Sequence, residues 1–104
     1  MLEVRQVSAS PAGEGLWAIR WCVTSTAPIE IASAWLPHSR FRAEEFPVGQ
    51  TGRSFELESG VHWDGAPVEN AFLILRMAGG RAFARLRVIV GAGGLPWAEC
   101  EAVT

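Results

Sequence analysis

The segment AFLILRMAGGRAFARLRVIV (residues 71–90) predicts a β-hairpin. Two largely apolar runs flank Gly79 and Gly80. A glycine pair is typical of a two-residue hairpin turn, because glycine readily adopts positive φ angles. Counting outward from this turn places Ile74 opposite Arg85, and every other cross-strand pair of the hairpin follows from the same register.

The two faces of the predicted hairpin differ in composition. Successive side chains of a strand point to opposite faces of the sheet. One face is wholly apolar and is expected to lie in the core: Leu73, Leu75, Met77, Ala82, Ala84, Leu86 and Val88. The other face mixes three apolar side chains with four arginines: Phe72, Ile74, Phe83, Arg76, Arg81, Arg85 and Arg87. We expect this second face to lie outside the core.

Three interpretations of the arginine face remain open. Arginine stems can cover apolar groups while their guanidinium groups pair with carboxylates, for which Glu99, Glu101 and Glu30 are the candidates. Alternatively, the face binds a protein, as a homodimer or with an acidic partner domain, because arginine and aromatic residues are enriched at interfaces. The candidate interaction surface is Phe72, Ile74, Arg76, Phe83, Arg85 and Arg87. In the third interpretation, Arg85 and Arg87 clamp an anionic ligand.

The rest of the chain predicts an all-β fold. Short apolar segments alternate with Gly and Pro, and no long helical periodicity occurs, which is typical of an antiparallel β-sandwich of the immunoglobulin-like or fibronectin-like kind. We expect seven or eight strands in a single domain covering residues 1–104. Besides the hairpin, the expected strands are residues 2–9, 16–25, 28–36, 41–46, 54–59 and a final strand within 95–104. A short helix over residues 42–46 is the competing interpretation of the fourth segment.

Composition argues against several classes of function. The formal net charge is -2, all nine basic residues are Arg, and no basic field of the kind that binds nucleic acid is present. No apolar run is long enough to span a bilayer, and Glu3 and Arg5 interrupt any apolar leader, so a cytoplasmic location is favoured. Two cysteines, Cys22 and Cys100, are too few for a disulfide framework. One disulfide between them is the alternative to the two buried free thiols that we expect.

The sequence does not predict an enzyme. His38 and His62 have no histidine or cysteine at metal-ligand spacing, and no nucleophile accompanies His62 and Asp64. The GAGG segment (residues 91–94) lacks the lysine and the following helix of a nucleotide-binding loop. We therefore expect a non-enzymatic protein without cofactor or metal.

Tryptophan residues suggest an alternative function. The chain contains five tryptophans, of which Trp17, Trp21 and Trp35 are expected to be buried. Trp63 and Trp97 lie beside Gly, Pro or Asp in segments expected to be loops. These two side chains predict either a platform for a carbohydrate or small ligand, or plugs at the ends of the sandwich.

Overall fold

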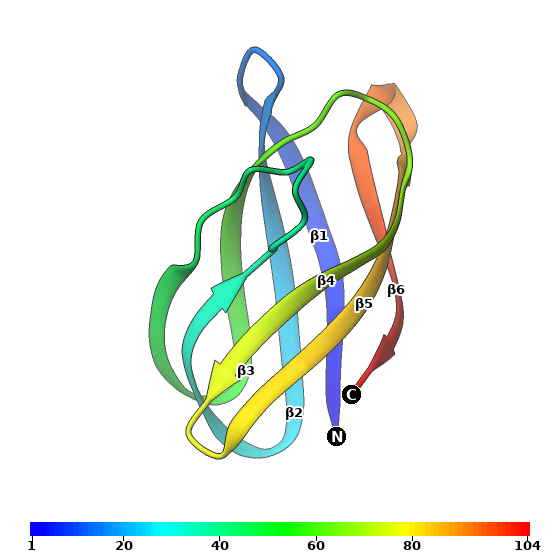
Figure 1. The fold of residues 1–104 in the computed structure, drawn as a ribbon. Helices are drawn as coiled ribbons and strands as arrows, with labels where there is room; N and C mark the ends of the chain where they lie inside the picture. Colours follow the sequence, from blue (N-terminus) through cyan, green and yellow to red (C-terminus); the bar gives the residue numbers. More distant parts are fainter.

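The computed structural model describes all residues from Met1 to Thr104, and the fold is all-β (Figure 1). The strands are β1 (Leu2–Gly13), β2 (Leu16–Trp35), β3 (Phe46–His62), β4 (Val68–Met77), β5 (Gly80–Val90) and β6 (Pro96–Val103). They form one antiparallel sheet in the order β1-β2-β4-β5-β6, with β3 paired to β2. The one helical element is a 3-10 turn, η1 (Ala92–Gly94), so no helix could cross a membrane.

The chain forms six strands, not the seven or eight predicted. Residues 16–25 and 28–36 were expected to be separate, but they belong to the single long strand β2, which ends at Trp35. Residues 41–46 form neither the predicted strand nor the competing helix, since a turn covers residues 39–42 and β3 begins at Phe46. The predicted segment 54–59 is the middle of β3.

Strands β2 and β3 bend together and thereby curl the sheet into a half-barrel (Figure 1). Their pairing runs from Leu16–His62 to Thr24–Ser54, and resumes at Ile29–Gly52 after a shift in register. The interruption includes Pro28, a residue that cannot donate to a strand ladder and is tolerated at such irregularities. The first half of β2 also pairs with β1, and its last residues pair with β4.

The curl brings two apolar faces together as one core. Its members come from every strand, with the largest fully buried side chains at Trp21, Ile31, Leu73, Leu75 and Leu86. Phe55 and Leu57 are buried as predicted, while Glu56 and Glu58 face solvent. The one polar group of the buried Trp21 ring is satisfied, because its Nε1 donates a hydrogen bond to Ser59 Oγ at 2.9 Å.

The hairpin turn lies one residue earlier than predicted. Ala78 and Gly79 form the turn, and Met77 pairs with Gly80, the first residue of β5. Gly80 takes a φ of 142°, a region that residues with a Cβ seldom occupy. The positive φ that the glycine pair predicted therefore occurs at the second glycine only.

The predicted cross-strand partners are wrong, but the predicted faces are correct. Ile74 lies opposite Phe83 instead of Arg85, and Phe72 lies opposite Arg85. Moving the turn by one residue moves each pairing partner by two. Because side chains alternate with a period of two, a two-residue shift leaves each one on its original face. Leu73 and the rest of the apolar face are buried, except for the half-buried Met77, and the arginines are exposed.

Leu73 provides a test of the curled core. We expect Leu73→Ala to lower the free energy of unfolding by about 2–5 kcal/mol, because it leaves a cavity between the two halves of the sheet. The exposed Val90→Ala should change it by about 0.5 kcal/mol or less. Urea unfolding measures both, and equal effects of the two substitutions would contradict the curled arrangement.

Candidate interaction surface

Exposed aromatic side chains gather on the outer face of β2, β4 and β5. Trp35 and Phe72 are each 37% exposed, and Phe83 is 36% exposed. Cross-strand pairing joins Trp35 to Ile74 and Ile74 to Phe83, so these three residues form a row across three strands. Phe72 lies two residues from Ile74 and points to the same face. We refer to Trp35, Phe72, Ile74 and Phe83 as the aromatic face.

Trp35 is exposed, although the sequence predicted that it is buried. A register irregularity lies between Ile31 and Ser33, and it reverses the alternation of β2. Ile31 and Ala34 are consequently both buried, and Trp35 points outward. The indole Nε1 donates a hydrogen bond to the Ala43 carbonyl at 3.2 Å, which holds one edge of the ring against the sheet. Ala34 and Leu36, the apolar residues on either side of Trp35, are both buried. This pair of flanking apolar residues is the sequence feature that indicates an outward Trp35.

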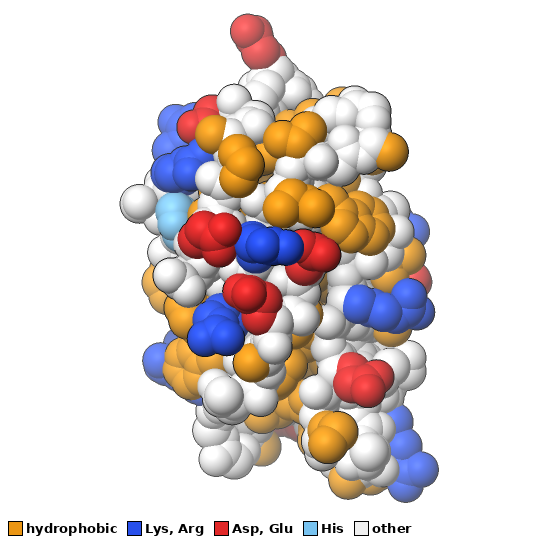
Figure 2. Space-filling view, turned by 90° about the vertical axis from the view of Figure 1, so that its right-hand side faces the viewer, with side chains coloured by type: hydrophobic (Ala, Val, Ile, Leu, Met, Phe, Trp, Pro, Cys, Tyr) orange, Lys and Arg blue, Asp and Glu red, His pale blue; other side chains and the backbone are white.

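The arginines of the predicted surface pair with carboxylates of the same chain. Arg87 lies 2.6 Å from Glu99, and Arg85 lies 3.8 Å from Glu101, as the pairing interpretation predicted. Arg76 pairs with Glu45 at 3.4 Å, whereas the third predicted partner, Glu30, takes no part in an ion pair. On the side of the molecule drawn in Figure 2, basic and acidic side chains accordingly adjoin one another.

These pairs change the electrostatic character of the surface. The hydrogen bond and charge of Glu99 raise the pKa of Arg87 above its ordinary value, so this guanidinium stays charged. Arg81, beside the hairpin turn, is the one arginine of this face without a carboxylate within 4.0 Å. The result is an apolar centre with a rim that is close to charge balance.

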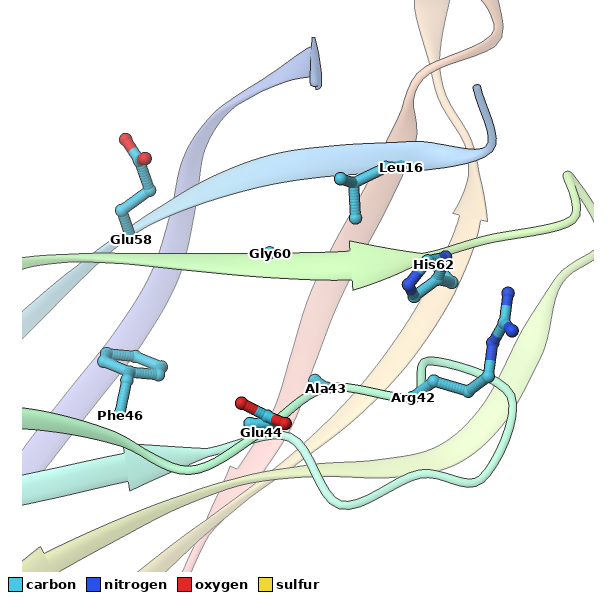
Figure 3. Close-up of a pocket in the computed structure, with 8 residues that line it drawn as sticks. All are labelled: Leu16, Arg42, Ala43, Glu44, Phe46, Glu58, Gly60 and His62. Carbon is cyan, nitrogen blue, oxygen red and sulfur yellow. The ribbon is translucent and has the colours of Figure 1, made fainter. Parts of the chain in front are cut away.

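A separate hollow of about 390 Å³ lies between the end of β3 and residues 42–46 (Figure 3). Its polar lining is Arg42, Glu44, Glu58 and His62, and Figure 3 shows His62 and Glu44 on opposite sides of it. No group of three or more His, Cys, Asp or Glu residues in the structure is placed to hold a metal. The hollow therefore presents charged groups to solvent without a metal-binding constellation.

The tryptophans of the alternative ligand platform are not both available. Trp63 is only 6% exposed, its Nε1 donates a hydrogen bond to Ala66 O at 2.9 Å, and its ring meets Trp17 edge-on at 6.4 Å. Trp97 is half-buried in β6, so it belongs to the predicted final strand and not to a loop. Trp63 therefore packs as a plug at the end of the core and offers no open ring face for stacking.

Both cysteines are free and half-buried. The prediction of free thiols is confirmed, although neither Cys22 nor Cys100 is fully buried. Partial burial raises the pKa of Cys100 above its ordinary value, so its thiol is protonated at neutral pH.

No family model, no curated protein and no solved structure matches this chain. Its function is therefore inferred from the residues and geometry of the chain alone.

The loop after β3 is held by one carboxylate. Asp64 Oδ1 accepts hydrogen bonds from Ala66 N at 3.0 Å and from Arg40 at 2.6 Å. Both bonds lower the pKa of Asp64 below its ordinary value of 3.8, and the bond from Ala66 has the larger effect. Arg40 also donates to the carbonyls of Ala66 and Pro67, so it joins two loops.

The lowered pKa of Asp64 predicts a dependence of stability on pH. A carboxyl whose pKa is lower in the folded state stabilises the fold above its unfolded-state pKa, and this contribution is lost as the pH falls through the folded-state pKa. Asp64→Asn should therefore be less stable than wild type at neutral pH, and the difference should shrink as the pH falls below the ordinary carboxyl pKa of 3.8. Thermal unfolding across this pH range measures it. Glu56→Gln, at an exposed carboxylate without an ion pair, is the control; a difference that persists unchanged in acid contradicts the prediction.

Proposed function

We propose that this chain is a non-enzymatic protein-interaction module that binds through its aromatic face, and that its first partner is a second copy of itself. The observation that carries the proposal is the convergence of Trp35, Phe72 and Phe83 on one outer sheet face. The other large exposed apolar side chains are scattered: Met1 and Val7 lie before and within β1, and Val90 lies at the far end of β5. Clustered exposed aromatics on a rigid sheet are typical of interface hot spots.

We also infer that the curled sheet is a β-sandwich of the immunoglobulin-like or fibronectin-like kind. In this description one layer contains β1, residues 16–25 of β2 and residues 54–62 of β3. The other contains residues 46–52 of β3, residues 29–35 of β2, β4, β5 and β6. The pairing of β2 with β3 in both layers, and of β4 with β2 and β5, supports this assignment. Strand β6 is then an additional edge strand beside β5.

Charge pairing within the chain favours self-association over an acidic partner. Arg76, Arg85 and Arg87 already have carboxylate partners, so two copies can approach face to face without strong repulsion. An acidic partner would have to displace those carboxylates. Stable interfaces bury about 800 Å² on each partner, with an apolar centre inside a polar rim. The aromatic face and its ion pairs have this arrangement.

Substitution of the exposed aromatic side chains tests the proposal. Phe83→Ser and Trp35→Ser should each weaken self-association by roughly thirtyfold or more, because truncating a hot-spot aromatic costs about 2 kcal/mol or more. Val90→Ser, at an exposed position away from the aromatic face, should associate like wild type. Sedimentation velocity over a concentration series measures the masses. A wild-type chain that remains monomeric at every concentration would refute self-association. Variants that associate like wild type would refute the aromatic face as the site of association.

A further inference from the structure

The two ends of the sheet meet along a seam that no strand ladder closes. β1 and β6 are the terminal strands in the order β1-β2-β4-β5-β6, and each pairs with one neighbour only. The curl of the sheet brings them side by side (Figure 1). Each therefore presents a backbone edge toward the other.

One side chain bridges the seam near the start of β6. The buried Gln6 of β1 donates from Nε2 to Pro96 O at 2.9 Å, and its Oε1 accepts from Ala98 N at 2.7 Å. A side-chain amide thus supplies both the donor and the acceptor that a neighbouring strand would offer to β6. The edge of β6 is consequently oriented for hydrogen bonding across the seam.

Beyond Gln6, toward the chain termini, the backbone edges lack such a bridge. Residues along a strand direct their N–H and C=O groups to alternate sides. Thr104 exchanges both backbone hydrogen bonds with Phe83 on the β5 side, so the N–H and C=O of Val103 point toward the seam. The Met1 carbonyl is bonded toward β2, so the groups of Leu2 point away from β2 and toward the seam. Both strands there have unpaired edges.

An apolar groove of about 320 Å³ lies between these edges. It is lined by Leu2, Glu3, Val4 and Arg5 of β1, and by Cys100, Glu101, Ala102 and Val103 of β6. Leu2, Cys100 and Val103 pack against the core but remain partly exposed. Figure 2 shows this side of the molecule, where hydrophobic side chains appear along a furrow flanked by charged ones.

We propose that the seam binds an extended segment of a partner protein, which lies between β1 and β6 as an added strand. An extended polypeptide presents N–H and C=O groups on both of its edges, and this matches the unpaired edges on the two sides of the groove. Its alternate apolar side chains cover Leu2 and Val103. Its outward side chains meet Glu3 and Arg5, which are exposed and make no ion pair in the chain, so the segment carries both charge signs on that face.

Cys100 supplies a direct readout of binding at the seam. In a Cys22→Ser background it is the only thiol, and it lines the groove. The probes are synthetic ten-residue peptides in which Val or Leu alternates with Glu, Lys or Thr, compared with peptides of the same composition without alternation. We expect alternating peptides to slow alkylation of Cys100 by a maleimide and the non-alternating peptides not to do so.

Backbone N-methylation distinguishes strand addition from a side-chain pocket. Methylating every second amide of a binding peptide removes the donors on one edge, and should weaken binding by roughly tenfold or more in fluorescence anisotropy. Val103→Arg should reduce binding similarly, whereas Val90→Arg should not, with circular dichroism confirming that both variants fold. Absence of binding by any alternating peptide, or binding that tolerates N-methylation or Val103→Arg, overturns the proposal. Phe83→Ser should not weaken peptide binding, so a failure of peptide binding is separable from a failure of self-association.

Discussion

The joint bend of β2 and β3 determines the rest of the structure. Their hydrogen-bonded pairing continues on both sides of the bend, so one sheet supplies both walls of the core. The two walls therefore do not have to associate as independent sheets, because the backbone pairing of β2 with β3 already connects them. Trp21 in one half of the curl and Leu73 in the other belong to a single core for this reason. Burial of their apolar surface then stabilises the bend that brought them together.

A curled sheet that stops short of closure has two ends, and this accounts for the seam. Six strands leave β1 and β6 adjacent but without a ladder between them. Buried backbone groups at such an edge need partners, and unprotected edges favour association with other chains. The Gln6 amide satisfies part of this need over a short length. Along the rest of the seam, near Leu2 and Val103, an apolar groove lies between the backbone edges of β1 and β6. A strand from another chain fits this groove because it can bond to both backbone edges and cover the apolar side chains.

The sequence predicted which side chains share a face better than which residues are paired. The hairpin faces were correct because the error in the turn shifted every pair by two, an even number. The same alternation failed at Trp35, because the irregularity after Ile31 reverses it, and no glycine or proline marks that point. At Pro28 the error was different: the proline suggested a boundary between two strands, but β2 continues through it and only bends. Trp63 illustrates a further limit: its neighbours are typical of a loop, yet it plugs the end of the core.

Glu101 connects the two surfaces that the fold leaves available. Its carboxylate pairs with Arg85, and Arg85 lies opposite Phe72 of the aromatic face. Glu101 also lines the groove between β1 and β6. A segment in the seam that places a basic side chain beside Glu101 competes with Arg85 for the same carboxylate. Release of Arg85 would add an unpaired guanidinium beside Phe72 and so increase like-charge repulsion between two copies packed through that face. Strand addition at the seam and self-association through the aromatic face are therefore expected to oppose each other, although their contact residues are otherwise separate.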